Sequence, residues 1–208
     1  MEITKIEKQK KHRARYNIFL DGDFAFGLFD DTLLKFGLRT KDKLNETMIT
    51  EIKEYDEFNY GKKIAYSFLS YRQRSKKELT KKLKDKKISK SGIDKIIKLL
   101  EEQKFINDST YAKMYLESKI RNKPMGKRLL QNKLFEKGID KDTAEKTLNE
   151  NYSEEKEIDS AKKLLEKYTK KIKGKDANEK KQKCYRYLIS RGFDFEIVNK
   201  VVNIRSDN

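Results

Sequence analysis

Three segments of the chain share one register of apolar residues and lie about fifty residues apart. When Leu83, Leu134 and Leu188 are aligned, each segment has an apolar residue five positions later and another fourteen positions later. A further column lies four positions earlier, on the same helical face. The three columns are Leu79, Leu130 and Cys184; Ile88, Ile139 and Phe193; and Ile97, Leu148 and Val202. This internal repeat predicts a tandem helical array whose units bury their apolar stripes against neighbours.

Arrays of this kind present a long outer surface and usually bind partners rather than catalyse reactions. The composition agrees, because only 36% of the residues are hydrophobic and 41% are charged, so the core must be thin. The net charge of +17 favours a polyanion or an acidic protein surface as partner. We therefore expect binding that weakens as salt is added.

Several sequence features that would indicate a membrane, a secretory route, a metal site or an enzyme are missing from the chain. No segment has the roughly twenty apolar residues of a membrane span, and the N-terminus has no apolar secretory stretch, so we expect a cytoplasmic protein. One cysteine and one histidine cannot supply a structural zinc site. Phosphate-loop and hydrolase motifs are missing. We place His12 in a solvated basic run and Cys184 in the core, and we predict neither an enzyme nor a cofactor or metal.

The N-terminal block has a different pattern. Residues 16–20 and 24–28 alternate around Asp21 and Gly22, which predicts a β-hairpin. The segment 3–15 could add a third strand, although Ile3 and Ile6 do not fit strict alternation. A short helix should end at Gly37, and another should start at Asn45 or Thr47. This block either covers the exposed end of the array or is a separate partner-binding module.

The array itself is predicted as three repeats of three helices. In repeat 1, one helix follows Gly61, Ser75 and Glu78 form a capping box at the start of the second, and the third starts near Ser89 or Ser91. Gly138 and Gly192 each precede an apolar residue, as in a Schellman stop, whereas repeat 1 has Lys87 there. The predicted fold is mainly α, with a small N-terminal α+β block at 1–58, repeats at 59–107, 108–152 and 153–204, and a disordered tail at 205–208.

Basic residues concentrate in the outer two repeats. Residues 60–100 hold fourteen Lys or Arg against three Asp or Glu, and residues 161–192 hold twelve against three. A charge run can simply be a solvated helix face. Two features favour a contact surface instead: Lys76 and Lys77 lack acidic partners at i,i+4, and both oppose the helix dipole. Tyr71 is the best candidate for stacking on a base. The densest basic group is Arg72, Arg74, Lys76, Lys77, Lys81 and Lys82.

The repeats resemble a known family. The pattern A-x-x-F-L-S-Y-R-Q-R-S-x-x-E-L-x-x-K-L from Ala65, F-I-N-D-x-x-Y-A from Phe105, and G-K-R-L-L-x-x-K-L-x-x-K-G-I from Gly126 resemble the RecX family, regulators of the recombinase RecA. The resemblance covers roughly residues 60–203, with the third repeat more divergent. The hairpin block is similar to the extension of RecX proteins of Gram-positive type.

The resemblance implies a protein that docks on the RecA filament and limits ATP hydrolysis, strand exchange and cleavage of the SOS repressor. It implies roles in DNA repair and homologous recombination, with single-stranded and also double-stranded DNA as further partners. We expect a monomer. The alternative is a basic DNA-binding protein that acts without RecA. The expected RecA- or DNA-binding residues are Arg72, Arg74, Lys76, Lys77, Lys81, Lys82, Arg121, Lys127 and Arg128.

Overall fold

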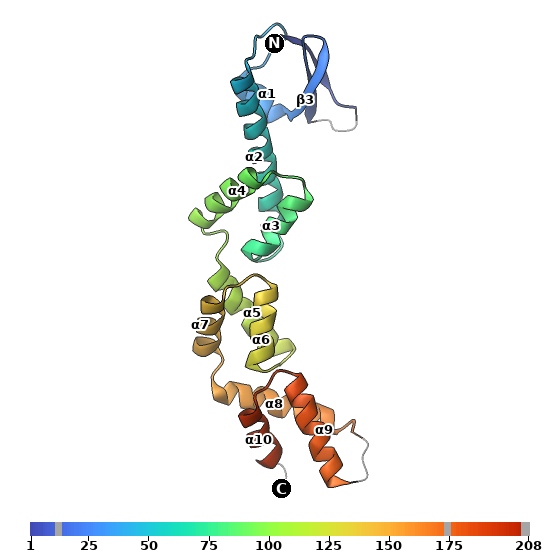
Figure 1. Ribbon diagram of the computed structural model, residues 1–208, viewed down its shortest axis with the longest axis vertical. Helices are drawn as coiled ribbons and strands as arrows, with labels where there is room; N and C mark the ends of the chain where they lie inside the picture. The colour runs from blue at the N-terminus through green and yellow to red at the C-terminus, as the bar shows by residue number, and fades with distance from the viewer. Residues whose placement is uncertain (11–13, 173–175, 205–208) are drawn as a thin grey trace. The chain divides into compact units, whose positions relative to one another are not determined.

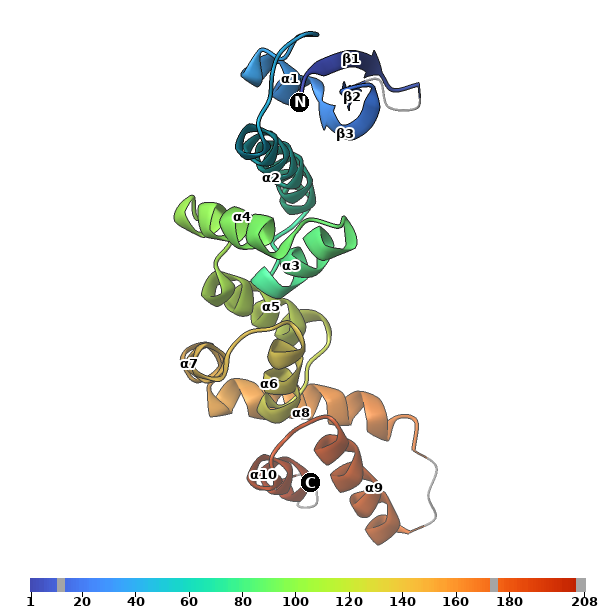
Figure 2. The ribbon, with the colours of Figure 1, turned by 45° about the horizontal axis from the view of Figure 1, so that its top comes forward.

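The computed structural model describes residues 1–10, 14–172 and 176–204. The prediction for His12, part of the lysine-rich segment after α8 and the predicted disordered tail lie outside these ranges. The chain, drawn as a ribbon in Figures 1 and 2, divides into two compact units. The first comprises residues 1–72 and 79–105, and the second comprises residues 73–78 and 106–208. No helix in the described ranges is long and apolar enough to cross a membrane.

The N-terminal block contains an antiparallel sheet in the order β1 (Ile3–Lys8), β2 (Arg15–Leu20) and β3 (Asp23–Phe29). Both the hairpin and the third strand are therefore confirmed. The β1–β2 register shifts between Ile3 and Lys5, which explains why Ile3 and Ile6 do not alternate simply. A second shift between Ile18 and Phe19 pairs Phe19 with Phe24, whose rings pack edge to face at 5.9 Å.

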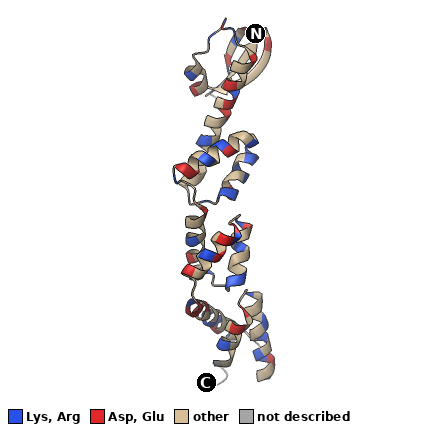
Figure 3. Cartoon of the chain, turned by 60° about the vertical axis from the view of Figure 1, so that its left-hand side comes forward, with Lys and Arg blue, Asp and Glu red and all other residues tan. Residues whose placement is uncertain are grey.

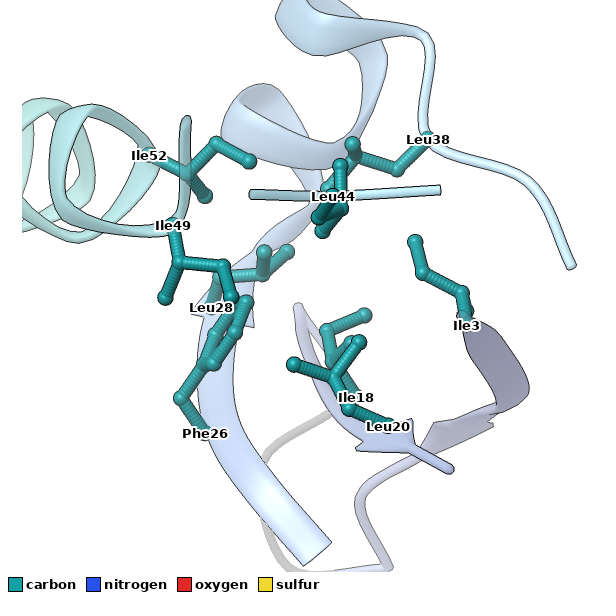
Figure 4. Close-up of a cluster of buried hydrophobic side chains, with 9 residues drawn as sticks. All are labelled: Ile3, Ile18, Leu20, Phe26, Leu28, Leu38, Leu44, Ile49 and Ile52. Atoms are coloured by element: carbon teal, nitrogen blue, oxygen red, sulfur yellow. The ribbon is translucent and has the colours of Figure 1, made fainter. Parts of the chain in front are cut away.

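One face of this sheet packs under two helices (Figure 4). Ile18 and Leu28 are almost fully buried from the sheet side. Leu38 and Leu44, from the connection between the helices, and Ile52 complete the same core. The helices are α1 (Asp30–Phe36), which ends at the left-handed Gly37 as predicted, and α2 (Glu46–Ser70), whose first turn is capped by the Asn45 side chain.

The prediction of two helices between Asn45 and Tyr71 is wrong, because α2 is a single helix of 25 residues. The predicted boundary after residue 58 falls inside it. Gly61 suggested a break, but it is a buried packing position: a Cβ there would lie 2.3 Å from Ile96 Cδ1. The buried carboxylate of Asp56 holds the same helix to the block, accepting from the Phe29 N–H at 2.8 Å and the Thr32 hydroxyl at 2.7 Å.

Three three-helix repeats follow the block. Repeat 1 uses the later part of α2 with α3 (Lys76–Asp85) and α4 (Lys90–Glu102), which is capped by Ser89, one of the two starts that the sequence left open. Repeat 2 comprises α5 (Asp108–Asn122), α6 (Lys127–Glu136) and α7 (Lys141–Asn151). Repeat 3 comprises α8 (Glu154–Thr169), α9 (Ala177–Ser190) and α10 (Phe195–Ile204).

The aligned columns confirm the repeat. Leu83, Leu134 and Leu188 are each 0% exposed, and every other member of the three predicted columns is at most 7% exposed. The free Cys184 is buried in its column, as predicted for a core residue. The shared apolar stripe therefore forms the inner face of each three-helix repeat and leaves the charged residues on the outside.

The stop after the second helix is also shared. Gly138 and Gly192 have φ values of +85° and +84°, and the following Ile139 and Phe193 donate their N–H groups back to Leu134 and Leu188. Lys87 takes the same left-handed conformation with φ of 60°. We expect a lysine there to be less favourable than a glycine, because its Cβ crowds the backbone.

Candidate partner-binding surface

Several predicted contact residues lie at the start of α3, in the part of that helix that belongs to the second unit. Ser75 is 0% exposed, and its hydroxyl accepts from the Glu78 N–H at 3.2 Å while donating to the Lys137 carbonyl at 2.7 Å. The Lys76 N–H donates to Asp108 Oδ1 at 2.8 Å. We call this set, residues 75–78 with Asp108 and residues 137–138, the α3 junction.

The α3 junction also contains a shielded ion pair. The Glu78 carboxylate lies 2.9 Å from the Lys137 ammonium, and the two side chains are 17% and 34% exposed. The Ser75 cap predicted from the sequence is therefore present. Its contacts with the turn after α6 could not be read from the capping-box pattern, because the partners lie about sixty residues away.

The start of α6 is arranged in the same way with different atoms. The Gly126 N–H donates to the Arg191 carbonyl at 3.0 Å, and the Arg128 N–H donates to the Gly192 carbonyl at 3.2 Å. The Lys127 N–H donates to Glu157 Oε1 at 2.8 Å. We call this set, residues 126–128 with Glu157 and residues 191–192, the α6 junction.

In both junctions, a carboxylate from the first helix of the following repeat accepts the first N–H of α3 or α6. Such N–H groups have no partner inside their own helix, and a carboxylate there also complements the helix dipole. Glu157 is only 2% exposed. Burial raises the pKa of its carboxyl above the ordinary value, while the hydrogen bond from Lys127 works in the opposite direction.

These contacts change the interpretation of the basic helix starts. The sequence argument held that positive charge in the first turn of α3 lacks acidic partners, because none lies at i,i+4. The structure supplies acidic groups from elsewhere: Asp108 at the start of the helix, and Glu157 at the equivalent place in α6. The local charge imbalance is therefore weaker support for an external partner than the sequence suggested.

The side chains of the junction residues still reach solvent. Lys76, Lys77 and Arg128 are exposed, and Lys127 is half-buried. The Arg128 guanidinium approaches the Ile189 carbonyl at 3.5 Å. The backbones of these residues thus build the junctions, while the side chains of Lys76, Lys77 and Arg128 stay exposed on the surface.

The other predicted residues lie elsewhere. Arg72 is exposed and Arg74 half-buried in the segment between α2 and α3. Lys81 is exposed on α3, and the Lys82 ammonium lies 5.5 Å from the centre of the Phe68 ring. Lys81 and Lys82 belong to the first unit, with Arg72. Basic residues are spread over many helices rather than confined to one (Figure 3).

Arg121 stands apart from the junctions. It lines a groove in the second unit together with Lys156, Lys163 and Lys167. The sequence reasoning did not select these three lysines. Their spacing of seven and four residues, which repeats on one helical face, was the available signal.

No group of three or more His, Cys, Asp or Glu in the described ranges could hold a metal ion. Tyr71 is 81% exposed, as a base-stacking residue would need to be. The described surface carries cationic side chains on several helices, four of them in the groove that Arg121 lines.

Comparison with known proteins places all of these elements in one family. Family models match residues 1–45 (RecX N-terminal domain), 62–100, 107–148 and 154–202 (the first, second and third three-helix domains of RecX). "Regulatory protein RecX" of Staphylococcus aureus strain JH9 is 36% identical over 202 residues, which is 97% of this chain and 74% of the relative. The protein of the same name from strain N315 matches to the same extent.

Solved structures agree with this result. A crystal structure of regulatory protein RecX covers 97% of this chain and 98% of its own, with a TM-score of 0.73 and 29% identity. A crystal structure of RecX from Lactobacillus salivarius covers 72% of this chain and 96% of its own, with a TM-score of 0.67 and 28% identity. By its repeats, its N-terminal block and its relatives, this chain belongs to the RecX family of regulatory proteins.

Proposed function

We propose that this protein binds the RecA filament on single-stranded DNA and inhibits its ATP hydrolysis, strand exchange and coprotease activity. The observation that carries the proposal is membership of the RecX family, with a match to all four RecX domains in order. On this proposal the protein is a cytoplasmic, monomeric and non-enzymatic factor in recombination, DNA repair and the SOS response.

The arrangement of charge supports the proposal. A filament of protein and DNA presents acidic side chains and phosphates, and the chain carries a net charge of +17. The predicted contact residues Lys76, Lys77 and Arg128 extend into solvent from helices that the junctions hold in place. A surface on rigid helices loses less conformational freedom on binding than a surface on loops.

The test is a titration of RecA-dependent ATP hydrolysis on single-stranded DNA. We expect inhibition at substoichiometric amounts of the wild-type protein. The variant Arg72→Glu with Arg74→Glu should inhibit at least about tenfold less, given 1.4 kcal/mol per decade. A matched control reverses two exposed lysines outside the predicted set, Lys90→Glu with Lys98→Glu on α4. Undiminished ATP hydrolysis with equimolar wild-type protein would contradict the proposal.

The charge favours a second candidate, a DNA-binding protein that acts without RecA. This candidate predicts tight binding to free DNA at moderate salt, and no effect on RecA filaments that were assembled first and cleared of free DNA. Pull-down of preassembled filaments at several salt concentrations separates the two functions. Retention on such filaments, together with inhibition, favours the RecA regulator.

A further inference from the structure

A groove of about 610 Å³ lies in the second unit, between the ends of α5 and α7 and one side of α8, the long orange helix in Figure 2. Its lining carries four cationic and two anionic side chains, and its apolar lining is limited to Ile120 and Pro124. The full lining is Glu117, Ile120, Arg121, Asn122, Pro124, Asn151, Lys156, Lys163, Glu166 and Lys167.

The cations in this groove are only partly neutralised. Glu166 is engaged with Lys170, outside the lining, at 3.1 Å. Lys156 donates to the Asn151 carbonyl at 3.2 Å, and none of the carboxylates that the structure describes lies within 4.0 Å of its ammonium group. Within the described ranges, no carboxylate lies within 4.0 Å of the charged nitrogens of Arg121, Lys163 or Lys167. The groove therefore gathers positive charge that the protein does not balance locally.

Three of these cations form a row. Lys156, Lys163 and Lys167 follow a spacing of seven and four residues, so they share one face of α8. At 1.5 Å per residue, the row extends over roughly 16 Å. Arg121 adds a fourth charge from the last turn of α5. A row of this length suits a chain of successive negative charges better than one small anion.

The rest of the lining favours a nucleic acid over a protein. Protein interfaces depend on buried aromatic or aliphatic anchors, and this groove offers one isoleucine and one proline. Contacts to a sugar-phosphate backbone come instead from Lys, Arg and amide side chains, which here include Asn122 and Asn151.

We propose that this groove binds the sugar-phosphate backbone of single-stranded DNA, with Arg121, Lys156, Lys163 and Lys167 as the phosphate contacts. Contacts of this kind position a strand without reading its sequence. The inference rests on the proposed function only in choosing DNA as the nucleic acid. Its test uses DNA without RecA, so failure of the groove and failure of RecA regulation are observed separately.

The test measures binding of the full chain to a fluorescent oligothymidine by anisotropy at several salt concentrations. The variant Lys163→Glu with Lys167→Glu should bind at least about tenfold more weakly. Each phosphate contact contributes roughly 0.7 to the slope of log affinity against log salt for single strands, so the slope should shrink by about 1.4. Circular dichroism checks that the variant is folded.

The matched control makes the same change in net charge outside the groove, on the two helices α5 and α8 that line it. Lys113→Glu on α5 with Lys162→Glu on α8 alters two exposed lysines and should weaken binding by less than about threefold. Equal losses in both variants would mean that only total charge matters and would overturn the proposal. A groove variant that keeps its affinity for DNA would also overturn the proposal. This holds even if the variant loses affinity for polyglutamate, an acidic polypeptide tested in the same way.

Discussion

The α3 and α6 junctions each place the first turn of a helix against a turn of the following repeat, but different atoms make the contact. At α3, the Ser75 side chain bridges to the Lys137 carbonyl. At α6, Gly126 has no side chain, and its backbone bonds directly to Arg191. A Cβ on Gly126 would lie 2.2 Å from the Gly192 oxygen. A hydroxyl bridge and a direct backbone contact can thus serve the same position of the repeat.

The largest effect on stability is expected at the α6 junction, where the backbone at Gly126 contacts the backbone of residues 191–192 directly. Gly126→Ala should lower the free energy of unfolding by about 3 kcal/mol, because the new methyl group must displace the turn at residues 191–192. Denaturant unfolding of the purified chain measures the change. The control Lys127→Ala keeps the N–H that bonds to Glu157 and should change stability by no more than about 0.5 kcal/mol. A Gly126→Ala variant as stable as its control would refute the tight contact.

The hydroxyl bridge should have a smaller effect. Ser75→Ala removes both the cap on Glu78 and the bond to the Lys137 carbonyl, so we expect a loss of about 1–2 kcal/mol in the same experiment. The exposed Ser118→Ala on α5 serves as control and should be close to wild type. If Ser75→Ala were neutral, the α3 junction would depend on Asp108 and the ion pair alone.

The comparison also shows how far the sequence predicts this fold. The aliphatic register around Leu83, Leu134 and Leu188, the Asp21-Gly22 hairpin and the left-handed stops are local patterns, and all are confirmed. The sequence did not predict that α2 is continuous, because Gly61 was interpreted as a helix break. The structure shows that a glycine is needed there to leave room for the Ile96 side chain, 35 residues away.

The candidate surface was predictable only in part. A run of basic residues identifies Lys76 and Lys127 as charged surface positions, but nothing near them indicates that their N–H groups bond to Asp108 and Glu157. Those partners lie about thirty residues away, in the next repeat. Hydrogen bonds between repeats depend on how the repeats pack, and a local sequence pattern does not encode that packing.

The turns after α3 and α6 give a third, smaller test. Lys87 occupies the left-handed position that Gly138 occupies in repeat 2. Lys87→Gly should raise the free energy of unfolding by about 0.5–1 kcal/mol, because the relief of steric crowding exceeds the added flexibility of the unfolded chain. Its neighbour provides the control: Lys86→Gly gains only the flexibility and should destabilise the protein. Equal effects of the two variants would contradict the stated role of the turn.

The two junctions should also differ in how the free energy of unfolding depends on pH. Because burial raises the pKa of Glu157 in the folded protein, the folded state holds a proton that the unfolded state has released as pH rises above the ordinary value of 4.5. The contribution of this group to stability is therefore fully present at low pH and falls as pH rises through the folded-state pKa. Glu157→Gln keeps an oxygen to accept the Lys127 N–H but cannot ionise. Its unfolding free energy, measured across that range, should gain on the wild type as pH rises, and the exposed Glu155→Gln is the control for the loss of one carboxylate from the same helix. Parallel curves for both variants would mean that the α6 junction carries no titrating group, and the two junctions would then differ only in their packing.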